Sequence, residues 1–105
     1  EPVRRASSRV QAVAAWVAPT DLKLMVRGEP TRLPAYDRFP ALELDMKSAS
    51  ANSPLDFASA DDAPALLLVG GKDDLVPAKH SEMMHRAFQK VGVATKMVVF
   101  QDSGH

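Results

Sequence analysis

The sequence has 105 residues, of which 46% are hydrophobic and 25% are charged, as in an ordinary globular protein. Its 13 basic and 13 acidic side chains give a formal net charge of zero, which argues against nucleic acid or an anionic membrane as a partner. The absence of cysteine excludes disulfides and thiolate metal sites, and no apolar run approaches the roughly 20 residues of a membrane-spanning helix.

The first apolar run extends from Val10 to Ala18 and stops at Pro19-Thr20-Asp21. Its length predicts a strand buried on both faces, although periodicity alone also allows a helix. Trp16 lies within this run, and we expect it in the core. Asp21 follows the run, and we expect it to form a turn rather than to contact a substrate.

Residues 22–64 follow as an irregular segment rich in proline. Each proline removes a backbone donor and fixes φ, so a regular sheet cannot pass through this segment. We expect short helical turns around Leu42, Leu44 and Met46, and a linker of small residues from Ser48 to Ser53. An irregular stretch of this length typically borders a binding site or carries an insertion. The prolines are Pro30, Pro34, Pro40, Pro54 and Pro64.

Two further strands are predicted in residues 65–105. Ala65–Val69 is apolar throughout and ends at Gly70-Gly71, and Thr95–Phe100 is rich in β-branched and large apolar residues. Apolar strands of this kind fit a parallel sheet covered on both faces. The sequence therefore predicts the α/β class, with a right-handed crossover between these two strands.

The crossover is predicted to be a helix from Pro77 to about Val91. Its apolar residues have the i, i+3, i+4, i+7 spacing of one helix face, and Gly92 suits the left-handed position after the last turn. Phe88 is expected in the core. The residues of the apolar face are Met84, Ala87, Phe88 and Val91.

An acid and a histidine each follow one of these two strands. Asp73 lies four residues after Val69, and His105 lies five residues after Phe100. Because adjacent parallel strands end at the same sheet edge, we expect the Asp73 carboxylate within hydrogen-bond reach of the His105 imidazole. Such a carboxylate fixes the imidazole tautomer, stabilises the imidazolium and leaves Nε2 for a nucleophile. These are two of the three groups of a hydrolytic triad.

Simpler roles remain open for both residues. Asp73 and Asp74 could form only a turn or a cap of the next helix, where a carboxylate is favourable in any case. His105 could be an ordinary residue at the end of the chain. Asp74 is the alternative acid, whereas Asp102, on the same loop as His105, is expected to face solvent.

The other two histidines do not indicate a metal site. His80 and His85 are five residues apart, which separates them by roughly 140° around a helix. They lack the i, i+4 spacing of a helical zinc pair, and we expect both at the surface. The methionines show no ligand spacing.

Two loop motifs resemble a known family. Gly70-x-x-Asp73-x-x-Val76-Pro77, a helix ending in Val91-Gly92-Val93, and a strand running into Gly104-His105 resemble the C-terminal third of α/β-hydrolase esterases. The acetyl-esterase and carboxylesterase group and the prolyl oligopeptidase-like peptidases are the most similar. The resemblance covers residues 1–105 and implies the C-terminal part of an α/β-hydrolase fold, with parallel strands, crossover helices and an incomplete domain.

The resemblance assigns Asp73 as triad acid and His105 as triad base. The family's serine lies in a G-x-S-x-G elbow, which none of the serines here has, so we expect the nucleophile and the oxyanion hole upstream of Glu1. The implied function is hydrolysis of a small-molecule carboxylic ester, without metal or organic cofactor. The 105 residues alone are expected to be inactive.

Two alternatives stay open. The first is a prolyl oligopeptidase-like serine peptidase, which a long upstream β-propeller would indicate. The second is a non-catalytic binding domain of the same fold, which the lack of an upstream G-x-S-x-G would indicate. The sequence does not indicate cellular location, oligomeric state or the acyl and alcohol groups.

Overall fold

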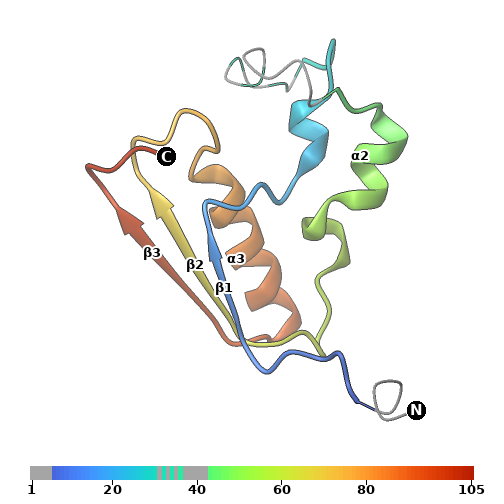
Figure 1. Cartoon of the computed structure of the whole chain (residues 1–105), viewed down its shortest axis with the longest axis vertical. Helices are drawn as coiled ribbons and strands as arrows, with labels where there is room; N and C mark the ends of the chain where they lie inside the picture. The colour runs from blue at the N-terminus through green and yellow to red at the C-terminus, as the bar shows by residue number, and fades with distance from the viewer. Residues whose placement is uncertain (1–5, 31, 33, 35, 37–42) are drawn as a thin grey trace.

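The computed structural model describes residues 6–30, 32, 34, 36 and 43–105. A parallel sheet with strand order β1-β2-β3 forms its centre (Figure 1). The strands are β1 (Val13–Trp16), β2 (Ala65–Gly70) and β3 (Thr95–Phe100). In the pairing register, Val13 lies opposite Ala65, and Ala65 lies opposite Thr95. All three strands therefore end at one edge of the sheet, and the predicted α/β class with parallel strands is confirmed.

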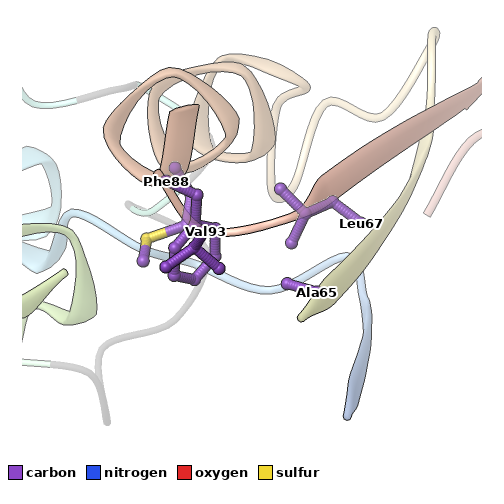
Figure 2. Close-up of a cluster of buried hydrophobic side chains, with 5 residues drawn as sticks. Ala65, Leu67, Phe88 and Val93 are labelled. Atoms are coloured by element: carbon purple, nitrogen blue, oxygen red, sulfur yellow. The ribbon is translucent and has the colours of Figure 1, made fainter. Parts of the chain in front are cut away.

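Helix α3 (Lys79–Val91) connects β2 to β3 and packs on one face of the sheet (Figure 1). It ends at Gly92, whose φ of 82° is the left-handed conformation that favours glycine, and the Gly92 N–H donates to the carbonyls of Phe88 and Gln89. The main core forms where this helix meets β2 and the start of β3 (Figure 2). Burial of each large side chain contributes about 1.5–3 kcal/mol. The buried cluster consists of Ala65, Leu67, Met84, Phe88 and Val93.

The connection from β1 to β2 is more regular than predicted. It contains the 3₁₀ turns η1 (Leu22–Met25) and η3 (Pro54–Phe57) and the helix α2 (Met46–Asn52). The expected linker from Ser48 to Ser53 is wrong, because Ser48 to Asn52 belong to α2. The Asp45 carboxylate starts this helix by accepting from the Ser48 N–H at 2.7 Å.

The predicted helical turns around residue 46 are only partly confirmed. Met46 begins α2, whereas Leu44 precedes the helix and Leu42 lies outside the described residues. Ser53 is fully buried; its hydroxyl donates to the Ala49 carbonyl at 2.7 Å and accepts from the Leu22 N–H at 2.8 Å. This side chain therefore fixes α2 against η1.

Strand β1 differs from the prediction in length and burial. It is shorter than the run from Val10 to Ala18, because Val17 has a φ of 49°, which a β-branched residue rarely adopts and which ends the strand. Val13 is 42% exposed and Trp16 is 66% exposed. The expected burial on both faces is therefore wrong within the described chain, since β1 lies at the sheet edge and α3 covers one face.

Candidate active site

The loop after β2 holds Asp73 through its own backbone. Asp73 Oδ1 accepts from the N–H groups of Leu75 and Val76, each at 2.9 Å, and the side chain has 0% exposure. Helix α3 has Ala78 as its N-cap, five residues after Asp73. Of the two simpler roles considered for Asp73, the cap of α3 is wrong, whereas the turn is present. The turn uses only Oδ1 of the carboxylate.

The loop after β3 packs directly on this first loop. The Phe100 carbonyl accepts from the Gly71 N–H at 2.8 Å, and the Ser103 carbonyl accepts from the Lys72 N–H at 2.9 Å. At Gly70, a Cβ would lie 2.2 Å from the Gly104 carbonyl oxygen. Glycine at position 70 therefore permits the close approach of the segment that carries His105.

The two loops bring the predicted acid and histidine together. His105 Nδ1 lies 3.0 Å from Asp73 Oδ2, in the arrangement expected from the parallel strands. The His105 side chain is 44% exposed, whereas that of Asp73 is buried. With Nδ1–H donating to the carboxylate, the neutral imidazole presents its basic nitrogen, Nε2, for a further partner.

The remaining predicted acids lie elsewhere. Asp102 is 95% exposed and pairs with Lys72 at 3.4 Å, so its expected place in solvent is confirmed. Asp74 is also exposed, and the carboxylate bonded to His105 is that of Asp73. Asp21 caps η1 by accepting from the Lys23 N–H at 3.1 Å, which confirms the expected turn.

Trp16 lines the cavity beside His105, a position that the sequence interpretation missed. Its ring stacks on that of Phe100, with centroids 6.1 Å apart and planes at 12°. The stacked pair borders a cavity of about 420 Å³ that His105 also lines. The expected core position of Trp16 is wrong, although its place at the carboxyl end of a strand could have indicated the site. The other lining residues are Gly70, Ser103 and Gly104.

His80 is fully buried, so its expected surface position is wrong. Its Nδ1 accepts from the backbone N–H groups of Thr20 and Asp21 at 3.2 and 3.3 Å, and its carbonyl accepts from the Thr20 hydroxyl at 2.7 Å. Helical periodicity could not reveal this, because the partners come from a segment about 60 residues away. His85 is partly buried and contacts the Thr95 hydroxyl at 2.9 Å.

The partners of His80 determine its tautomer. Two N–H groups donate to Nδ1, so the neutral ring carries its proton on Nε2, which lies 2.7 Å from the Tyr36 hydroxyl oxygen and donates to it. Burial lowers the pKa of His80, which keeps the ring neutral at pH 7. Tyr36 is 2% exposed, and burial, followed by the charge of Asp73, raises the pKa of Tyr36 to about 12.

Within the described residues, no group of three or more histidine, aspartate or glutamate side chains could hold a metal ion. None of the helices described is long and apolar enough to cross a bilayer. The hydrogen-bonded pair of Asp73 and His105 lies at the carboxyl edge of the sheet.

The sequence profile of the prolyl oligopeptidase family matches residues 3–105. The chain belongs to this family. Over 52 residues it is 38% identical to a carboxymethylenebutenolidase-like protein of Yersinia pestis, a match that covers 50% of this chain and 20% of that protein. Over 53 residues it is 38% identical to the uncharacterized peptidase YuxL of Bacillus subtilis, covering 50% of this chain and 8% of that one.

A solved structure confirms the fold of this family member. The acetyl ester-xyloside bifunctional hydrolase of Caldicellulosiruptor lactoaceticus superposes with a TM-score of 0.77 at 21% identity. The match covers 100% of this chain and 37% of that one. The chain therefore has the α/β-hydrolase fold and spans about a third of that enzyme and a fifth or less of the two relatives.

Proposed function

We propose that this chain supplies the acid and the base of a serine hydrolase that acts on carboxylic esters. The hydrogen bond between the buried Asp73 carboxylate and the half-exposed His105 imidazole carries this proposal. Its position at the carboxyl edge of a parallel sheet is the usual place for catalytic groups in such folds. The nucleophilic serine belongs to residues upstream of position 1, since no serine here stands in a G-x-S-x-G elbow.

In this mechanism, His105 Nε2 takes the proton of the serine as the serine attacks the acyl carbon. The imidazolium then protonates the alcohol leaving group, and the same nitrogen activates the water that hydrolyses the acyl-enzyme. Asp73 accepts from His105 Nδ1–H throughout. It thereby holds the ring and stabilises the imidazolium without accepting its proton.

The pocket beside His105 supports an ester with an apolar portion. Trp16 and Phe100 place two stacked aromatic rings next to the imidazole, where they offer a flat apolar wall to an acyl or alcohol group. Ser103 and Gly104 also line this cavity. A small uncharged ester fits these surroundings.

A serine peptidase is the second candidate. Membership of the prolyl oligopeptidase family and similarity to the peptidase YuxL support it. The same acid and base serve both reactions, because amide and ester hydrolysis pass through the same acyl-enzyme. Comparing kcat/KM for an ester and for the matching amide in the full-length protein distinguishes the two.

The test of the common mechanism is His105→Ala in the full-length gene product. We expect kcat for a p-nitrophenyl ester to fall by about 10⁴-fold or more, because loss of the base leaves the serine unactivated. Labelling by a fluorophosphonate should fall with it. His85→Ala, which changes a partly buried histidine of α3 outside the pocket, is the matched control and should retain activity.

Undiminished labelling and turnover in His105→Ala would remove this residue from the mechanism. Loss of turnover in both histidine variants would point to unfolding rather than chemistry. A full-length protein without any G-x-S-x-G serine and without labelling would favour the non-catalytic binding domain.

A further inference from the structure

Three segments meet at the buried side chain of His80. Helix α3 carries this residue, whose exposure is 0%. The Thr20 and Asp21 N–H groups donate to its Nδ1 at 3.2 and 3.3 Å, and the Tyr36 hydroxyl oxygen lies 2.7 Å from its Nε2. The Thr20 hydroxyl donates to the His80 carbonyl at 2.7 Å. These bonds hold the start of the crossover, residues 19–25, against α3.

Only a neutral imidazole fits these partners. A neutral ring has one nitrogen that accepts, whereas an imidazolium carries a proton on both nitrogens and accepts nothing. Protonation of His80 would point a new Nδ1–H at the Thr20 and Asp21 N–H groups, and all three donors would lack an acceptor. It would also place a charge in a fully buried site, which is costly.

We propose that His80 is an acid-sensitive contact between the crossover and α3, and that protonation of its ring releases residues 19–25 from the helix. In the released state, water solvates the imidazolium and the two freed N–H groups. The opening is local, because the pairing of β2 with β3 and the buried cluster under α3 do not include this contact. This inference goes beyond the proposed function and does not depend on it.

The groups around His80 set the direction of the response to pH. Burial has the largest effect and lowers the pKa of His80 from its ordinary value of 6.5, while Asp21 opposes this shift and Lys79 adds to it. Burial, followed by the charge of Asp73, raises the pKa of Tyr36 to about 12, so the phenol stays neutral in mild acid. The released ring binds a proton more readily than the attached ring. The attached state is therefore fully favoured above pH 6.5 and loses stability as the pH falls below this value.

His85, on the same helix, makes a contact that tolerates protonation. Its Nδ1 lies 2.9 Å from the Thr95 hydroxyl, a group that can either donate or accept. A protonated ring can therefore donate to the oxygen of this hydroxyl, and the bond is kept in both states. His85 thus provides a matched control for a change at His80.

The experiment measures amide hydrogen exchange in the full-length protein between about pH 7.5 and about pH 5, with each observed rate compared with the intrinsic rate at that pH. In peptides that cover residues 19–25, we expect protection to be constant above pH 6.5 and to fall by up to about tenfold per pH unit below it. Protection of β3 should not change. Constant protection of residues 19–25, or an equal loss in β3 from global unfolding, would overturn the inference.

The deciding variant is His80→Asn, whose amide oxygen can take the place of Nδ1 and accept from the Thr20 and Asp21 N–H groups. An amide does not bind a proton in this range, so we expect the protection of residues 19–25 to change by less than about twofold across it. His85→Asn is the control and should keep the pH dependence of the wild type. A wild-type pH dependence in His80→Asn, or its loss in both variants, would contradict the proposed role of His80.

A second measurement decides the question if His80→Asn does not fold. In the wild-type full-length protein, the nitrogen NMR shifts of the histidine rings distinguish the neutral form from the imidazolium. We expect the loss of protection in residues 19–25 to coincide with the appearance of the imidazolium form of His80. A loss of protection while this ring stays neutral, or a protonated ring with protection intact, would rule the inference out.

Discussion

At the residue scale, Asp73 illustrates how a buried carboxylate is held in place. Taking a charge out of water is costly unless donors replace the solvent. Here two backbone N–H groups hold Oδ1, and His105 occupies Oδ2. The turn formed by residues 73–76 thus fixes the position of the carboxylate.

The two oxygens of this carboxylate make the substitution Asp73→Asn informative. The amide oxygen can keep both backbone donors, but the amide nitrogen cannot accept from His105 Nδ1–H. The imidazole then adopts the wrong tautomer, and we expect kcat of the full-length protein to fall by about 10³–10⁴-fold. Circular dichroism should show that the fold is retained.

Asp102→Asn is the control for Asp73→Asn. It changes an acid on the His105 loop that is 95% exposed and that forms an ion pair with the exposed Lys72. We expect its kcat to stay within about twofold of the wild type. A variant Asp73→Asn that keeps most of its activity would exclude the carboxylate from the mechanism.

At the element scale, the site depends on how closely the ends of β2 and β3 approach. The sheet register places Gly70 opposite Phe100, and the segment Ser103–Gly104 that precedes His105 packs against Gly70. The backbone N–H groups of Gly71 and Lys72 donate hydrogen bonds to this loop and hold it in place. The position of the imidazole is therefore set by strand ends rather than by its own side-chain packing.

Gly70→Ala tests this dependence. An added Cβ would lie 2.2 Å from the Gly104 carbonyl oxygen and 2.4 Å from that of Ser103, so the loop must move. We expect the free energy of unfolding to fall by about 1–3 kcal/mol and ester turnover to fall with the displaced His105. Gly104→Ala is the control for stability, because a Cβ there meets nothing within 4 Å. Equal stability of both variants, measured by urea unfolding, would contradict this account.

At the scale of the whole molecule, one face of the sheet exposes apolar side chains to solvent. Helix α3 covers one side of the sheet (Figure 1). Trp16 and Phe100 stack on one another near the carboxyl ends of β1 and β3, and both side chains are exposed. Strands β1 and β3 each have only β2 as a neighbour within the described residues. Among the residues that the structure describes, the exposed large hydrophobic side chains are Val10, Val13, Trp16, Met46, Phe57 and Phe100.

This exposure predicts the behaviour of the isolated 105-residue polypeptide. Open strand edges and apolar patches favour aggregation, and we expect the purified chain to bind a hydrophobic dye, to lack a cooperative thermal transition and to hydrolyse no ester. Calorimetry and dye fluorescence check this. A sharp, reversible transition would show that the sheet is stable without further cover.

The sequence by itself determined the features that depend on local pattern and chain order. Thr95–Phe100 is a strand with the predicted bounds, Ala65–Gly70 exceeds its prediction by one residue, and α3 ends at Val91 as predicted. The meeting of Asp73 and His105 followed from two parallel strands, because such strands must end at one edge. Their catalytic roles stay a proposal.

Only the tertiary structure decided what depends on contacts between distant segments. His80 is buried because Thr20 and Tyr36 reach it from the crossover. Trp16 is 66% exposed because it lies on the face of β1 that α3 does not cover. Small residues that looked like a linker form α2, which an aspartate cap and the buried Ser53 hold in place. Such partners lie tens of residues apart, so no local pattern of hydrophobicity or spacing could reveal them.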